Sequence, residues 1–385
     1  MDADDLCRRI RPERLAELTY ELVRIPSPTG QAADCTRFYA ERLRALGLEV
    51  SLEGGNYPAH PSAVAWLRGG DGPTVQFDAH TDTVPLPHPE PRREAERVIG
   101  RGATDMKGSL AAMAEVAAVL VEAGVTPPGD LLLTAHDLHE APGGLGETIT
   151  DLCARGIHGD VAIVCEGGQD VLPLVGRGMA IFELTVRRAG ELCHEVTGAP
   201  NPIEFAQQVA SRLLARNGEM ATRPEPYVGP ETIFLGQFHG GSFYNQIPNE
   251  VFLNGTWRFS PSKELPAVRA ELDELLASVL LPPEISLEIR FYQVRPSFAL
   301  DPAEPLVKAV QAAYAEVHGQ PLPLAASPAV CDVPVLVRAG VPCVGHGPLT
   351  HGAHGEPEWI ATPDLVRTTA VYLRTLAHYW SATGR

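Results

Sequence analysis

Histidine and carboxylate residues recur along this chain in short clusters, each placed after a run of apolar residues. His80 and Asp82 follow the run TVQFDA, and Asp105 lies in the glycine-rich segment GRGATDMKG. Because His80 and Asp82 are two residues apart, an extended backbone projects both side chains to the same side. A histidine beside a carboxylate is typical of a metal ligand and the group that orients it. Asp105 could coordinate one ion or bridge two.

Three further clusters repeat this arrangement. His139 and Glu140 follow the run DLLLTA, Glu166 follows DVAIVC, and His351 and His354 follow a later strand-like run. An apolar run that abruptly turns polar predicts a strand that delivers side chains to the edge of a sheet. In open α/β sheets, ligands bind at that edge.

Two histidines and three carboxylates suffice for two metal ions, provided that one carboxylate bridges them. Mixed nitrogen and oxygen ligands favour Zn²⁺, with Co²⁺ or Mn²⁺ as alternatives. Two neighbouring ions can hold a bridging hydroxide and polarise a carbonyl, which hydrolyses amides near neutral pH. The pattern therefore indicates a two-metal hydrolase.

The elements that position these clusters follow from the apolar pattern. Strands near 48–53, 62–67, 74–79, 130–135 and 160–165 alternate with helices, which predicts a mostly parallel sheet covered on both faces. From about residue 176 the order becomes β-α-β-β-α-β, which suits an inserted open-faced sandwich. We therefore expect an α/β fold, with a mostly parallel mixed sheet flanked by helices in residues 1–175 plus 293–385 and an inserted α+β sandwich at 176–292.

Composition excludes several functional classes. The 385 residues carry a net charge of −17, which disfavours nucleic acid and anionic membranes as partners. The seven cysteines are scattered without a CxxC pair, which favours reduced thiols and a cytoplasmic location. We see neither a signal peptide nor an apolar run of about 20 residues that could span a membrane.

The segments FDAHTDTVP, GRGATDMKG, HEAPGGLG, CEGG and AHGEPEWI, in this order and spacing, resemble the M20 metallopeptidases. That family includes acetylornithine deacetylase, succinyl-diaminopimelate desuccinylase, aminoacylase and carboxypeptidase G, and the resemblance spans nearly the whole chain. It implies terminal metal ligands at His80, Glu140 and Glu166, a bridging ligand at Asp105, a last ligand at His354, and a catalytic role for Asp82 in orienting His80. His351 rivals His354, but the family pattern AHxxxE matches Ala353, His354 and Glu358.

The chain departs from the family at the position of the catalytic base. Relatives carry two adjacent glutamates, of which the first is the general base, whereas this chain has His139 before Glu140. His139 could be the base, since imidazole titrates near neutral pH, although two nearby cations would lower its pKa. Asp137 could do this work instead, or hydrolysis could be lost or redirected. We expect His136 to be a polar loop residue.

The inserted domain resembles the family's lid, which usually also forms a homodimer. His194 matches the lid histidine, which reaches an active site, commonly that of the partner subunit, and stabilises the oxyanion. Asn245 and Arg258 match residues that hold the substrate's carboxylate, and the planar fork of arginine suits that task.

These observations together predict a metal-dependent amidohydrolase that removes an acyl group from an N-acyl amino acid or a similar carboxylate-bearing amide. The resemblance favours deacylation because the family's second-site carboxylate, here Glu166, tends to be glutamate in N-deacylases. One alternative is a dipeptidase or carboxypeptidase with the same site. The other is a metal-binding homologue with lost or redirected hydrolysis, either an amide-forming biosynthetic enzyme or a binding protein, which the histidine at position 139 favours.

Overall fold

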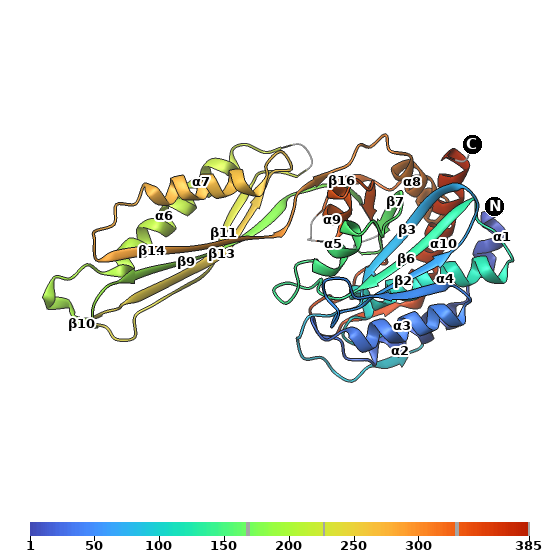
Figure 1. Cartoon of the computed structure of the whole chain (residues 1–385), viewed down its shortest axis with the longest axis horizontal. Coiled ribbons are helices and arrows are strands. Elements are labelled where there is room, and N and C mark those ends of the chain that lie inside the picture. Colours follow the sequence, from blue (N-terminus) through green and yellow to red (C-terminus); the bar gives the residue numbers. More distant parts are fainter. Residues whose placement is uncertain (167–169, 226–227, 328–330, 384–385) are drawn as a thin grey trace. The chain divides into compact units, whose positions relative to one another are not determined.

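The computed structural model describes residues 1–166, 170–225, 228–327 and 331–383. The chain forms two compact units (Figure 1). The larger unit comprises residues 1–174, 300–325 and 331–385, and the inserted unit comprises residues 175–299 and 326–330.

A six-stranded mixed sheet forms the centre of the larger unit, in the order β1-β2-β6-β3-β7-β17. The last four strands of that order pair in parallel, whereas β1 and β2 pair antiparallel to their neighbours. The predicted α/β fold is therefore confirmed. The strands are β1 (Glu49–Glu53), β2 (Ser62–Leu67), β6 (Gly129–His136), β3 (Gly72–His80), β7 (Val161–Val164) and β17 (Cys343–Gly345).

The two faces of this sheet differ in polarity. On one face, Val75, Phe77 and Ala79 of β3 join the main hydrophobic core with residues from α2, α3, α4, α8 and α10. Side chains alternate along a strand, so the residues between them point to the opposite face. These residues include Asp78 and His80, which are buried although they are polar. The strand β3 therefore carries an apolar face and a face with titratable groups.

Helices of the larger unit begin and end where the sequence provides signals. For example, Pro12 starts α2, at a position where the missing N–H of proline has no helical partner. A separate feature is the burial of α4 on nearly all sides, which makes it a central helix. The helices are α1 (Ala3–Arg8), α2 (Pro12–Val23), α3 (Ala33–Ala45), α4 (Gly108–Glu122), α5 (Glu147–Ala154), α8 (Pro305–His318), α9 (Val333–Arg338) and α10 (Thr362–Thr383). None of the helices in the described ranges has the length and apolar character needed to cross a membrane.

The inserted unit is a four-stranded antiparallel sheet in the order β11-β13-β9-β14, with helices α6 and α7 packed on it. Burial alternates strictly along β9 and β13, so alternate residues such as Phe182 and Trp257 form its core. Its elements are β9 (Gly178–Arg188), β10 (Cys193–His194), α6 (Pro202–Ala221), β11 (Thr232–Gly240), β12 (Gln246–Ile247), β13 (Glu250–Phe259), α7 (Leu265–Ala277) and β14 (Ile285–Arg295).

Several short strands complete the chain. Two of them, β4 and β5, form an antiparallel sheet with β18, in a stretch whose pairing the apolar pattern did not indicate. The short strands are β4 (Arg92–Glu94), β5 (Arg97–Ile99), β8 (Leu172–Gly176), β15 (Phe298–Ala299), β16 (Leu324–Ala326) and β18 (Trp359–Ala361).

Candidate metal centre

His80 is held at the end of β3 with one ring nitrogen directed at a carboxylate. Its Nδ1 donates to the backbone carbonyl of Asp82 at 2.9 Å, and its Nε2 lies 3.2 Å from Asp105 Oδ1. The Asp82 carboxylate in turn accepts the backbone N–H groups of His139 (3.1 Å) and Glu140 (3.0 Å). Asp82 therefore fixes the ring of His80 and the backbone of the two residues opposite it, and it leaves Nε2 of His80 available to an ion.

Asp105 faces one histidine with each of its carboxylate oxygens. Its Oδ2 lies 3.2 Å from His354 Nε2, which is also 3.1 Å from Glu140 Oε1. Burial opposes ionisation of Asp105, but hydrogen bonds from His354 and His80 outweigh it and hold the pKa of Asp105 below its usual range. An ionised carboxylate between two sets of donors is arranged to bridge two ions.

His354 rather than His351 reaches this cluster. The ring of His351 stacks on Trp359, with 3.8 Å between the ring centroids, and its Nε2 lies 3.5 Å from Asp364. His354 has a φ of 59°, in the left-handed region that non-glycine residues rarely adopt. With this left-handed backbone conformation, the ring of His354 lies beside Asp105.

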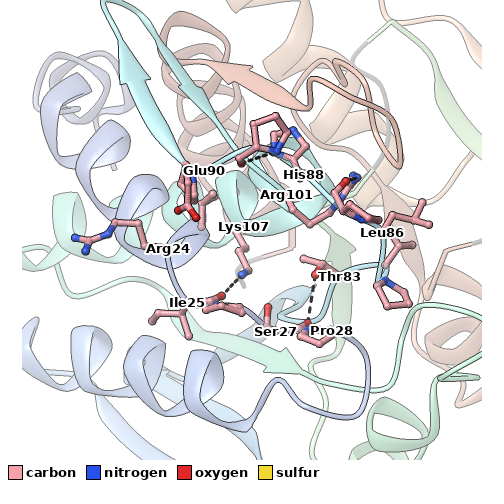
Figure 2. A pocket seen from close by; sticks show the side chains of 17 residues that line it. Arg24, Ile25, Ser27, Pro28, Thr83, Leu86, His88, Glu90, Arg101 and Lys107 are labelled. Atoms are coloured by element: carbon pink, nitrogen blue, oxygen red, sulfur yellow. Dashed lines mark hydrogen bonds between the residues drawn. The ribbon is translucent and has the colours of Figure 1, made fainter.

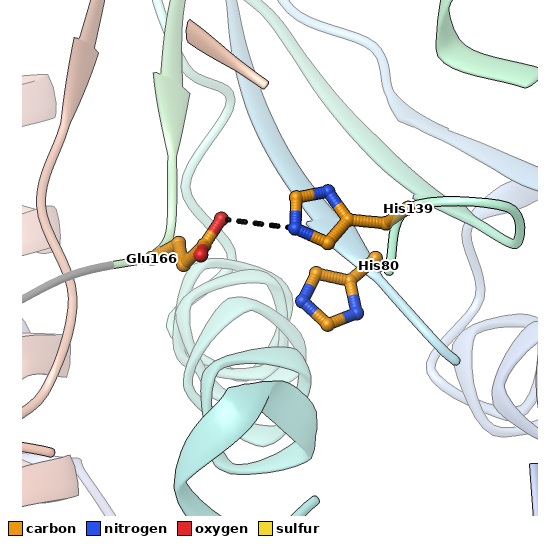
Figure 3. A group of neighbouring side chains, drawn as sticks. All are labelled: His80, His139 and Glu166. Carbon is orange, nitrogen blue, oxygen red and sulfur yellow. Dashed lines mark ion pairs between the residues drawn. The ribbon is translucent and has the colours of Figure 1, made fainter. Parts of the chain in front are cut away.

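Glu166 completes the cluster on the side of His80. Donor atoms of His80, His139 and Glu166 all lie within 4.8 Å of one another (Figure 3). Glu166 Oε2 is buried and has no hydrogen-bond partner within the described part of the chain. Burial raises the pKa of Glu166 to about 7, more than the charge of His139 lowers it. A cation beside this oxygen would satisfy it and keep it ionised.

The donor chemistry therefore fits two divalent ions. Imidazole nitrogens and carboxylate oxygens converge in two sets that share His80. Besides the set of His80, His139 and Glu166, donor atoms of His80, Asp105 and Glu140 also lie within 4.8 Å of one another. This mixture of ligands suits Zn²⁺, Co²⁺ or Mn²⁺.

Glu358 supports the turn that carries Asp105. Its buried carboxylate accepts the backbone N–H groups of Thr104 (3.1 Å) and Asp105 (3.2 Å), and it pairs with Arg101 at 2.6 Å. In the sequence, Glu358 stands out only as part of the AHxxxE pattern. The structure shows that it fixes the backbone at Asp105, within the segment η1 (Ala103–Lys107).

Asp137 points away from this cluster. Its carboxylate accepts the backbone N–H groups of Gly30 (3.0 Å) and Ala32 (3.2 Å) and lies 3.0 Å from His60 Nδ1. Through these contacts, the Asp137 carboxylate fixes the position of the segment before α3. The geometry therefore disfavours Asp137 as the group that replaces the family's base.

The expectation for His136 was wrong. It is the last residue of β6 rather than a loop residue, it is fully buried, and its Nε2 lies 3.3 Å from Asp78 Oδ2. Asp78 precedes His80 by two residues on β3, so strand alternation places both on the polar face of the sheet. That spacing was visible in the segment FDAH and could have identified Asp78.

Asp332 is a further residue of the site that was not predicted from the sequence. Its Oδ2 lies 2.6 Å from His139 Nδ1, and the two residues are 193 positions apart in the chain. Asp332 stands at the start of α9, in a segment that contains no other histidine or carboxylate, so no local pattern indicated it.

In the inserted unit, two of the three predicted substrate-binding residues lie together. His194 Nε2 is 3.0 Å from Asn245 Nδ2, beside the β10–β12 pair. Arg258 lies near the other end of β13, roughly 26 Å along the strand from Glu250. Within one inserted unit, Arg258 is therefore far from His194 and Asn245.

The larger unit also has a pocket of about 510 Å³ beside the segment after Thr83 (Figure 2). Proline-rich residues 85–91 line it together with Ser27 and Lys107, whose Nζ donates to the carbonyl oxygens of Leu22 and Ile25. None of the described metal-ligand candidates lines this pocket. It is therefore separate from the metal centre.

Comparisons with known proteins agree with this geometry. The sequence profile of Peptidase family M20/M25/M40 matches residues 77–378. Succinyl-diaminopimelate desuccinylase of Xanthomonas euvesicatoria pv. vesicatoria is 28% identical over 379 residues, covering 94% of this chain and 97% of that protein. The structure of aminopeptidase PepT from Bacillus cereus has a TM-score of 0.80 at 20% identity, covering 96% of this chain and 99% of that one.

A dinuclear metal-binding peptidase of the M20 family from Bacillus subtilis has a TM-score of 0.70 at 17% identity, covering 97% of this chain and 99% of that one. Gly167 and Gly168 of the CEGG motif lie outside the described residues. The other motifs that suggested the resemblance fall within the matched region. The chain belongs to Peptidase family M20/M25/M40.

Proposed function

We propose that this chain removes the acyl group from an N-acyl amino acid, or from a similar amide that carries a free carboxylate. The chain is a metal-dependent hydrolase of amide bonds. The observation that carries the proposal is the position of Asp105, whose two oxygens face His80 on one side and His354 on the other. The glutamate at position 166 favours deacylation over peptide cleavage.

We assign one ion to His80, Asp105 and Glu166 and a second ion to Asp105, Glu140 and His354, with Zn²⁺ as the preferred metal and Co²⁺ or Mn²⁺ as alternatives. When bound, two such ions polarise the amide carbonyl and lower the pKa of water. Asp82 keeps Nε2 of His80 directed at its ion. His139, whose Nε2 faces the same cluster, takes the proton of the attacking water.

The inserted unit would handle the rest of the substrate. We assign the substrate's carboxylate to Arg258, which is partly exposed on β13 and can bind a carboxylate with two parallel hydrogen bonds. His194 and Asn245, paired at 3.0 Å, would stabilise the oxyanion and bind the substrate in the partner subunit of a homodimer formed through the inserted unit.

A substrate panel tests the proposal. The protein, with its metal content measured, is assayed with N-acetyl, N-succinyl and N-formyl amino acids, with dipeptides, and with the same N-acyl amino acids amidated at the carboxylate. We expect about two ions per chain and turnover that is highest for one class of N-acyl amino acids with a free carboxylate. Faster turnover of dipeptides would show a peptidase, and full metal loading without hydrolysis of any amide would refute the proposal.

A variant isolates the carboxylate contact. Arg258→Met should raise KM for the N-acyl amino acid about 10–100-fold, the value of a charge-assisted hydrogen bond, and should leave the amidated substrate unaffected. Arg290→Met is the matched control, because Arg290 is an exposed arginine of the same sheet whose partner is Glu183 at 3.2 Å. Equal losses in both variants, or equal losses on both substrates, would remove Arg258 from the site.

A further inference from the structure

His139 makes a short hydrogen bond on the side of its ring that faces away from the metal centre. Its Nδ1 lies 2.6 Å from Asp332 Oδ2, and both side chains are buried. Its Nε2 faces the centre and lies 3.8 Å from Glu166 Oε2. An ionised carboxylate accepts only, so Nδ1 carries the proton and the lone pair of Nε2 is directed at the centre.

Two roles are open to such a nitrogen, namely metal ligand and proton acceptor. The rings of His80 and His139 are stacked, with 4.0 Å between centroids and 1° between planes (Figure 3). An imidazole binds an ion in the plane of its own ring. An ion held by His80 would therefore not lie in the plane of the His139 ring, so this arrangement does not suit one ion held by both rings. The proximity of their nitrogens alone does not make His139 a ligand.

We infer that Asp332 and His139 form a dyad in which His139 is the general base and Asp332 is the residue that positions it. This inference rests on the proposed hydrolysis of amides. As the water oxygen bonds to the amide carbon, one of its protons passes to Nε2 of His139. When the C–N bond breaks, that proton passes to the leaving nitrogen. Asp332 stays ionised, retains the Nδ1 proton on His139 and stabilises the imidazolium.

The charge of the centre supports the dyad. Three ligand carboxylates would balance three of the four positive charges of two divalent ions, and a glutamate base at position 139 would add a fourth negative charge. A neutral imidazole does not, but Asp332 supplies the same negative charge one hydrogen bond further away. His139 with Asp332 therefore has the net charge of the glutamate that relatives carry, and a protonated His139 is tolerated beside the ions.

His136 lies near both Asp332 and Asp78. His136 Nε2 lies 3.7 Å from Asp332 Oδ2 and 3.3 Å from Asp78 Oδ2, so its ring stands between the two carboxylates. Asp78 accepts a hydrogen bond from Thr134 and lies beside His136, which makes Asp78 the matched control for Asp332. The two aspartates share burial, charge and a histidine neighbour.

Exchanging residues between the two positions separates positioning from structure. Asp332→Asn should lower kcat at least about 100-fold with metal content and KM nearly unchanged, because the amide can stabilise the wrong ring tautomer. Asp78→Asn should lower kcat less than about 5-fold. In the His139→Glu background, the base carries its own charge and Asp332 repels it. There, Asp332→Asn should leave kcat unchanged or raise it.

Equal losses from Asp332→Asn in both backgrounds, or losses equal to those of Asp78→Asn, would overturn the dyad and leave the hydrolase proposal intact. A wild-type protein that binds two ions and hydrolyses none of the amides would overturn the proposed function and the dyad with it. A second measurement does not require that the Asp332 and Asp78 variants fold. In ¹⁵N-histidine spectra of the metal-loaded protein, the resonance lost in His139→Gln should show a proton on Nδ1, and a proton on Nε2 alone would overturn the inference.

Discussion

Replacing Glu358 by glutamine should weaken metal binding although Glu358 is not among the proposed ligands. The Glu358 carboxylate is 1% exposed and accepts three donors, namely Arg101 Nη1 at 2.6 Å and the N–H groups of Thr104 at 3.1 Å and Asp105 at 3.2 Å. Glutamine keeps one oxygen for these donors. Its second head-group atom is a donor itself, and Arg101 loses its counter-charge.

The contacts set the size of the effect. Hydrogen bonds to a charged group contribute about 1.5–3 kcal/mol each. Because glutamine retains part of this set, we expect the free energy of unfolding to fall by about 2–4 kcal/mol. Since Glu358 fixes the backbone at Asp105, we also expect the metal dissociation constant to rise by about 10–100-fold, as for other groups that orient a ligand.

The assay has two parts, urea unfolding of the metal-free protein and metal competition with a chromophoric chelator. Glu94→Gln is the control, because Glu94 pairs with Arg92 at 2.7 Å and both side chains are about half exposed. Such a surface pair contributes at most about 1 kcal/mol. If Glu358→Gln binds metal as tightly as the Glu94→Gln control, Glu358 does not position Asp105 and the reasoning fails.

Three further changes have defined outcomes. Burial lowers the pKa of His136, but the charges of Asp78 and Asp332 outweigh it and raise the pKa to about 9. Its folded-state pKa thus exceeds the unfolded value of about 6.5, so protonated His136 stabilises the fold at low pH and this contribution is lost as the pH rises past about 9. Between pH 6.5 and 10, the metal-free wild type should therefore lose about 3 kcal/mol of unfolding free energy that metal-free His136→Gln does not lose. A flat difference between the two urea-unfolding series would contradict this. His354→Ala should cost one bound ion by metal analysis, whereas His351→Ala should retain both. Removing the ions with a chelator should abolish hydrolysis and lower the melting temperature, because buried carboxylates lose their counter-charges, and re-addition should restore both.

Local patterns made most of the fold and the ligand cluster predictable. The run before His80 and the run before His139 were read as strands, and the structure has β3 and β6 there, in parallel register with His80 opposite His136. Parallel pairing carries the ends of both strands to one edge of the sheet. Side chains that follow such runs must therefore meet, and the sequence contains that information.

Contacts between distant segments were not predictable in this way. Asp332 meets His139 because α9 packs beside β7 and β17, and nothing within the segment CDVP marks its aspartate. His136 illustrates the opposite problem. It begins the polar stretch HDLHE, which suggested a loop, yet it belongs to β6 and is buried against Asp78. Whether the polar face of a strand is buried depends on which segments cover the sheet. The residue pattern of one strand does not contain that information.

The histidine at position 139, where relatives carry glutamate, nevertheless says something about other residues of the site. Histidine in place of glutamate removes one negative charge from a buried centre designed for two divalent ions, and an uncompensated buried charge costs several kcal/mol. The substitution therefore predicts a carboxylate within hydrogen-bonding distance of the new imidazole, even though sequence alone cannot say which one. The nearest aspartate in sequence, Asp137, is engaged by the chain before α3, and the Asp82 carboxylate is engaged by backbone N–H groups. The compensating group had to come from elsewhere in the chain, and the 2.6 Å contact with Asp332 supplies it.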